Sequence, residues 1–201
     1  VIVSTAVGRG FKGQSASASE IKPGDAILMT KTAGIEGTGI IACDYEEELR
    51  EVLSGEELEH AKSLLSKVSV VKDGIIAGRI GTHGMHDVTE GGILGAVWEM
   101  CSIAGTGARL DAEAIPADDV TRRICEHYDI NMLRLISSGS MLIMTEEDKK
   151  EEIIRELAAQ GIPAAQIGKI VPKEEGLFIC EGGKQTQIDP PGPDELYKIV
   201  K

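Results

Sequence analysis

One stretch of the chain combines residue types that bind phosphate and divalent metal ions: residues 84–92, with the sequence GMHDVTEGG. Asp87 offers a carboxylate of the kind that Mg²⁺ prefers. Gly91 and Gly92 offer backbone N–H groups at the start of the next helix, a position suited to phosphate. The alternative is a capped helix after a tight turn, with the Thr89 hydroxyl as the N-cap acceptor. Local chemistry leaves both interpretations open.

Two histidines, His83 and His86, lie three residues apart at the start of this stretch. On a helix they would share one face and could bind a metal ion together. The intervening Gly84 and the turn-like context argue against a helix there. We therefore expect His86 to support Asp87 or to line the cleft of the candidate site.

A second candidate for anion binding is the stretch KTAGIEGTG at residues 31–39, which follows an apolar run at 26–30. A strand, a loop rich in glycine and threonine, and a helix that starts near Ile40 would hold an anion on backbone amides. Lys31 adds a positive charge for a phosphate. The spacing matches neither a P-loop nor G-x-G-x-x-G, so a plain loop is the alternative.

The elements that must position these residues are predicted from hydrophobic periodicity and turn residues. Strands are expected at 1–7, 26–30, 140–144, 166–171, 176–180 and 186–188, with a further strand beginning at 108. Helices are expected after a Ser54–Glu57 capping box, over 93–104, after Asp118, over 194–200, and between a cap at Thr145 and Asp148 and a stop at Gly161. Residues 69–80 fit either a hairpin turning at Asp73-Gly74 or a helix.

Strands and helices intermix without strict alternation, which predicts one α+β domain with a mixed sheet over residues 1–201.

A net charge of -12 argues against a nucleic-acid or membrane-surface partner. No apolar run approaches the length that spans a membrane. The four cysteines form no C-x-x-C pair, which is typical of buried thiols in a reducing compartment, and we expect a cytoplasmic protein. A start at Val1 without Met indicates a fragment of a longer protein.

The run from His86 to Ile93, HDVTEGGI, resembles the HDVTEGGL-type signature of the C-terminal domain of the AIR synthase (PurM-like) superfamily. The resemblance covers essentially the whole chain and is strongest to the HypE-like branch of hydrogenase maturation factors. Further stretches in family order are 23–31, 34–39, 115–116, 125–126 and 135–142. The resemblance favours a helix for residues 69–80.

The resemblance implies a PurM C-terminal-domain-like fold and an activity. Members of the superfamily use ATP and Mg²⁺ to phosphorylate or activate an oxygen, commonly of an amide or carboxamide. ATP binds between this domain and an N-terminal domain that carries acidic Mg²⁺ ligands and builds a homodimer. We expect that N-terminal domain to be absent from this chain, which would then be the substrate-side domain, inactive alone and without a tightly held cofactor. The alternative is a non-catalytic ligand-binding or scaffold module with the same fold.

Site residues follow from the resemblance by position. Asp87 would bind the metal or phosphate, with His86 beside it as the second catalytic residue. The residues expected to contact the cofactor are Thr89, Gly91 and Gly92 on one side of the cleft, and Lys31, Gly37, Thr38 and Gly39 on the other. One departure concerns the tail: HypE proteins end in a cysteine that carries the carbamoyl group, whereas this chain ends in the sequence KIVK.

Overall fold

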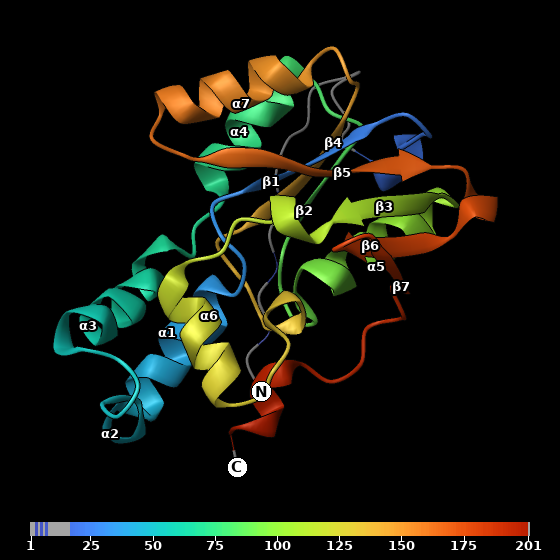
Figure 1. Cartoon of the computed structure of the whole chain (residues 1–201). Coiled ribbons are helices and arrows are strands. Elements are labelled where there is room, and N and C mark those ends of the chain that lie inside the picture. The colour runs from blue at the N-terminus through green and yellow to red at the C-terminus, as the bar shows by residue number, and fades with distance from the viewer. Residues whose placement is uncertain (1–2, 4, 6, 8–16, 201) are drawn as a thin grey trace.

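A single mixed sheet of seven strands forms the centre of the part of the chain that the computed structural model describes, residues 3, 5, 7 and 17–200 (Figure 1). The strands are β1 (Ala26–Thr30), β2 (Gly84–Asp87), β3 (Gly107–Asp111), β4 (Met141–Thr145), β5 (Ala164–Val171), β6 (Leu177–Glu181) and β7 (Lys184–Gln187). Their order in the sheet is β2-β4-β1-β5-β3-β6-β7. Neighbours are antiparallel except β3 and β6, which are parallel.

Helices cover both faces of this sheet. They are α1 (Ile35–Asp44), α2 (Glu46–Leu49), α3 (Gly55–Ser63), α4 (Val71–Ile80), α5 (Gly92–Ala104), α6 (Asp119–His127) and α7 (Lys150–Ala159). In Figure 1, α4 and α7 lie on one face and α5 on the other, while α1, α2, α3 and α6 gather beyond one end of the strands. Short 3-10 turns include η2 (Leu64–Lys67) and η6 (Glu195–Lys198). No helix among the described residues is long and apolar enough to cross a membrane.

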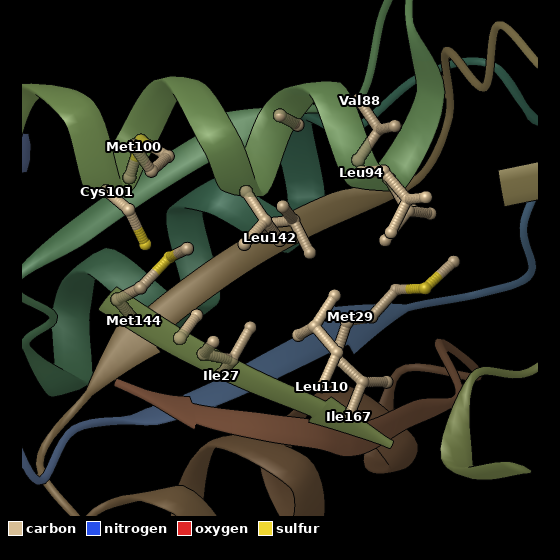
Figure 2. Close-up of a cluster of buried hydrophobic side chains, with 14 of the residues drawn as sticks. Ile27, Met29, Val88, Leu94, Met100, Cys101, Leu110, Leu142, Met144 and Ile167 are labelled. Carbon is tan, nitrogen blue, oxygen red and sulfur yellow. The ribbon is translucent and has the colours of Figure 1, made fainter. Parts of the chain in front are cut away.

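The central strand β1 is buried on both faces because its side chains alternate between two cores. Ile27 and Met29 pack in the cluster beneath α5, which Figure 2 shows between that helix and the sheet. Ala26 and Leu28 pack in the cluster under α4 and α7. A third cluster joins α1, α3 and α6. This double coverage explains why the strand reads as an uninterrupted apolar run.

Several predicted elements are confirmed. The α+β class and the mixed sheet are as expected, and residues 71–80 form helix α4 rather than a hairpin. The capping box is present: the Ser54 amide donates to Glu57 Oε2 at 2.7 Å, and the Glu57 amide donates to Ser54 Oγ at 3.3 Å. The carboxylate of Asp118 caps α6 by accepting from the Val120 amide at 3.2 Å.

Other predictions are wrong or fall outside the described residues. Helix α7 begins at Lys150 without a side-chain cap, and Thr145 instead ends strand β4, so the cap predicted at Thr145 and Asp148 is wrong. The predicted helix at 194–200 is only the short turn η6. The strand predicted at 1–7 falls on a segment of which residues 1, 2, 4 and 6 lie outside the described part.

Candidate functional site

The strands that lead into the two stretches predicted to bind a cofactor, β1 and β2, end on the same side of the sheet. This side is called the site edge of the sheet. Asp87, the last residue of β2, pairs with Met141, the first residue of β4. Thr30, the last residue of β1, accepts a hydrogen bond on its hydroxyl from the Met141 amide at 3.1 Å. Lys31 follows Thr30, so Lys31 and Asp87 lie on either side of the start of β4, separated by about two strand spacings, or roughly 10 Å. The sheet topology therefore brings together residues far apart in sequence.

The turn at residues 137–140 joins the two sides of this edge. Its Gly139 carbonyl accepts a hydrogen bond from Lys31 Nζ at 2.6 Å. Its Ser140 carbonyl accepts from the Val88 amide at 2.9 Å, and its Ser140 hydroxyl donates to the Thr32 carbonyl at 2.6 Å. Gly139 has a φ of 108°, and an added Cβ would lie 2.6 Å from the Lys67 carbonyl oxygen. This packed turn fixes the position of Lys31 relative to the residues that follow Asp87.

Asp87 presents an accessible carboxylate at this edge. Its side chain is 58% exposed, and the nearest basic side chain among the described residues is that of His86, whose Nδ1 lies 3.8 Å from Asp87 Oδ1. His86 is held in place from both sides of its ring: Nε2 lies 3.0 Å from Glu99 Oε2 on α5, and Nδ1 contacts the Asp87 carbonyl. The arrangement makes His86 a residue that anchors the end of β2 to α5.

A metal ion fits this edge only in part. Among the described residues there is no group of three or more His, Cys, Asp and Glu side chains that could hold an ion. Mg²⁺ in nucleotide sites is often bound by one or two carboxylates together with phosphate oxygens and water. Asp87 therefore fits as one ligand of a Mg²⁺–phosphate group, and the other ligands would have to come from elsewhere.

The start of helix α5 differs from the predicted cap. The N-cap residue is Gly91, with a φ of 81°, and no side chain caps the helix, so the prediction of a Thr89 hydroxyl cap is wrong. Thr89 contributes its carbonyl oxygen, which accepts from the Gly92 amide at 3.1 Å. Gly92 has a φ of 60°, and a Cβ there would lie 2.6 Å from the Leu133 carbonyl oxygen. Both glycines are needed for backbone conformation and close packing.

A carboxylate of the same chain occupies the helix start where phosphate was expected. The Gly91 amide donates to Asp194 Oδ2 at 2.8 Å, and Oδ1 accepts from the amides of Ile136 at 3.2 Å and Leu196 at 2.9 Å. Asp194 is only 3% exposed. Next to it, the Tyr197 hydroxyl donates to Glu90 Oε1 at 2.7 Å. The only sequence signal for Asp194 was its position as the first residue of the predicted helix at 194–200.

Lys31 is engaged inside the protein. Its Nζ lies 2.7 Å from Asp73 Oδ1 and also donates to the carbonyls of Ser69, at 3.2 Å, and Gly139. Asp73 is 1% exposed and the Lys31 side chain 16%. The backbone of Lys31 is left-handed, with a φ of 57°, which is uncommon for a residue with a side chain. Lys31 thus ties the end of β1 to the first turn of α4.

The predicted glycine-rich loop before residue 40 is wrong, because helix α1 begins at Ile35 and includes residues 37–39. A Cβ on Gly37 would lie 2.4 Å from Leu135 Cγ, and one on Gly39 would lie 2.5 Å from Leu65 Cγ. Thr38 donates its buried hydroxyl to that of Thr121 at 2.9 Å. These three residues serve close helix packing and present no loop of backbone amides.

Comparisons with known proteins agree with the fold. The family model described as AIR synthase related protein, C-terminal domain, matches residues 22–180. Carbamoyl dehydratase HypE of Azotobacter vinelandii is 27% identical over 206 residues, which cover 98% of this chain and 57% of the relative. The chain thus spans little more than half the length of such curated relatives.

Solved structures show the same architecture. The crystal structure of HypE from E. coli superposes with a TM-score of 0.74 at 26% identity, covering 92% of this chain and 55% of that one. A crystal structure of HypE in complex with ATP shares the fold, with a TM-score of 0.66 at 20% identity and the same coverage. From the family model and the shared fold, the chain belongs to the AIR synthase related protein family and corresponds to its C-terminal domain.

Proposed function

We propose that this chain is the substrate-side domain of an ATP-dependent, HypE-like enzyme. The full-length protein would use ATP and Mg²⁺ to phosphorylate or activate the oxygen of a small substrate such as a carboxamide. The similarity to carbamoyl dehydratase HypE and the HypE structure in complex with ATP support this reaction class. The observation that carries the proposal is the exposed carboxylate of Asp87 at a rigid sheet edge.

The role proposed for each residue follows from its contacts. Asp87 contributes one ligand to a Mg²⁺–phosphate group completed by the protein's own N-terminal domain, within a homodimer. His86 positions Asp87, because its ring links the end of β2 to Glu99 on α5. Mg²⁺, when bound, would neutralise charge on the phosphate oxygens. Phosphoryl transfer asks a protein mainly for positioning and electrostatic stabilisation, which an anchored carboxylate supplies.

Gly91, Gly92 and Thr89 support this site through the backbone rather than as phosphate ligands. The Gly91 amide is engaged by Asp194 and the Gly92 amide by the Thr89 carbonyl, so these groups shape the turn that follows Asp87. Lys31 takes a similar supporting part on the other side of β4 through its ion pair with Asp73.

The test uses the full-length protein and the substitution Asp87→Asn. We expect this variant to lose about 10²-fold or more in Mg²⁺-dependent ATP turnover, because charge stabilisation in the transition state would be lost. The matched control is Asp148→Asn, which removes an exposed carboxylate after β4, at the opposite end of that strand. Unchanged turnover and Mg²⁺ dependence in Asp87→Asn would show that the assigned role is wrong. If the wild-type full-length protein consumed no ATP with carboxamide substrates, the scaffold alternative would be supported instead.

A further inference from the structure

A cavity of about 480 Å³ opens beside Lys31 on the face of the sheet that α4 covers. Its walls come from the start of α4, from η2, from the end of β1 and from the turn between α7 and β5. Its lining includes the lysines Lys31, Lys67 and Lys72 and the apolar residues Ile35, Leu64 and Ile162. The volume is within the range of small-molecule sites, about 300–1,000 Å³.

Ile162 and Pro163 present apolar surface to this cavity, and buried core residues lie behind them. Ile35 and Leu64 are at most 1% exposed, and Ile162 is 7% exposed. Ile35 and Leu64 belong to the core that joins α1, α3 and α6, so neither can move away without disturbing that core. Pro163 also lines the cavity and is exposed. A pocket of this kind suits the hydrocarbon part of a ligand.

The rim carries an excess of positive charge, although the chain as a whole has a net charge of -12. Two carboxylates also line the cavity, and both are engaged: Asp73 pairs with Lys31, while Asp118 caps α6 and lies 2.7 Å from His60 Nε2. Within the described part of the chain, neither Lys67 nor Lys72 has a carboxylate within 4.0 Å. These two ammonium groups remain able to pair with an anion.

Two features of Lys31, which lies in the cavity wall, lower the stability of the folded protein. A left-handed backbone at a residue with a side chain costs roughly 1–2 kcal/mol, and burying an ion pair brings a large desolvation penalty. Both occur at Lys31, whose φ is 57° and whose partner Asp73 is 1% exposed. Strain of this type clusters at ligand-binding positions. Lys31 also contacts Gly139, in the turn whose Ser140 carbonyl accepts from the amide of Val88, next to Asp87.

We propose that this cavity binds the small-molecule substrate and that the substrate is an organic oxyanion with an apolar body. Its carboxylate or phosphate group would pair with Lys67 and Lys72, and its hydrocarbon part would lie against Ile162 and Pro163. The 137–140 turn connects this cavity to the end of β2, because Gly139 accepts from Lys31 and Ser140 accepts from the Val88 amide. That this ligand is the substrate rests on the function proposed above, whereas its binding to the cavity does not require ATP or the N-terminal domain.

The test is a ¹H–¹⁵N NMR titration of the 201-residue chain with phenyl phosphate and with benzoate, with benzyl alcohol as the neutral comparison. We expect the two anions to shift the amides of Thr32, Ser69 and Gly161, and benzyl alcohol to bind more weakly. The double substitution Lys67→Gln and Lys72→Gln should weaken anion binding about fivefold, as expected for two partly exposed ion pairs. The control pair Lys173→Gln and Lys184→Gln removes the same charge from the β6–β7 side of the sheet and should leave binding unchanged.

Which anion binds tighter identifies the preferred headgroup, and either result supports the proposal. Equal binding of benzyl alcohol, equal losses in both double variants, or shifts confined to residues outside the cavity would each overturn it. The two proposals can fail separately. Loss of ATP turnover in full-length Asp87→Asn without anion binding here would retain the proposed function and reject this cavity, and the reverse outcome would reject the role of Asp87 alone.

Discussion

The carboxylate of Asp194 lies 2.8 Å from the amide nitrogen of Gly91, a residue 103 positions earlier in the chain. This contact places a negative charge of the C-terminal segment at the N-terminus of α5, where the helix dipole stabilises anions. The same carboxylate accepts from Ile136 and Leu196. One buried side chain thus joins the C-terminal segment, the start of α5 and the loop before β4.

Replacing Asp194 should therefore destabilise more than its own segment. In Asp194→Asn, an amide NH₂ replaces one acceptor oxygen and leaves at least one buried backbone N–H without a partner. We expect a loss of about 1–3 kcal/mol in the free energy of unfolding, measured by urea denaturation. Hydrogen exchange at the Gly91 amide should accelerate. The control Asp189→Asn alters an exposed carboxylate five residues earlier and should leave both quantities unchanged.

Gly92 and Gly105 allow the cost of a left-handed backbone to be separated from that of a steric clash. Both have a positive φ, 60° and 68°, but a Cβ on Gly92 would meet three backbone atoms within 3 Å, whereas one on Gly105 meets nothing within 4 Å. Gly105→Ala should cost roughly 1–2 kcal/mol in unfolding free energy, the backbone penalty alone. Gly92→Ala should cost clearly more. Equal losses would contradict the close approach of Leu133 to Gly92.

The buried ion pair of Lys31 and Asp73 should show strong coupling. Asp73→Asn leaves the mostly buried ammonium without its charged partner, and we expect a loss of about 3 kcal/mol in unfolding free energy. Lys31→Met should be destabilising as well, and the double variant should cost less than the sum of the two. The exposed pair Lys22–Glu146 is the comparison: its distance is 3.1 Å, but Glu146→Gln should have little effect because solvent screens the pair. Additive losses at Lys31 and Asp73 would show that the pair is not coupled.

The buried thiols should resist alkylation in the folded protein. Burial raises the pKa of Cys101 to about 11 and that of Cys125 to about 12, so both stay protonated at pH 8. Cys43 is exposed. With iodoacetamide at pH 8, mass spectrometry should find Cys43 modified first, and Cys101 and Cys125 modified only in urea. Rapid modification of Cys101 in native protein would contradict its burial.

The same raised pKa values predict a loss of stability at alkaline pH. Unfolded thiols release protons near the ordinary value of 9.0, whereas Cys101 keeps its proton up to about 11. Between these values the folded state binds more protons, so stability falls by up to about 1.4 kcal/mol per pH unit for each such thiol. Urea denaturation from pH 8 to 10.5 measures this slope. Cys101→Ala should reduce the slope.

Helices and strands whose formation depends on neighbouring residues in the chain could be predicted from the sequence. The apolar run Ala26–Thr30 is strand β1, and the Ser54–Glu57 box starts α3, because each is determined by neighbouring residues. The apolar stripe after Gly92 is buried as expected, with Ile93 and Val97 fully inaccessible to solvent. The location of the candidate site at Asp87 also came from local chemistry and family resemblance, and its role remains a prediction.

Predictions failed where distant residues determine the local structure. Gly37 and Gly39 are typical of a loop, but the helix needs glycine there to make room for Leu135 and Leu65. The Thr89 cap failed because Gly91 and Gly92 both adopt positive φ and the free amide is taken by Asp194. Such a partner, 103 residues away, leaves no trace in the spacing around the motif.

The order of the strands has a consequence for how the chain folds. Among the described strands, only β6 and β7 are neighbours both in the chain and in the sheet. The central strand β1 pairs with β4 and β5, so Ala26 contacts Thr145 and Lys169. During synthesis one edge of β1 stays unpaired until β4 has left the ribosome, and the other stays unpaired until β5 has followed. Such non-local pairing slows folding and exposes apolar strand edges while the chain grows.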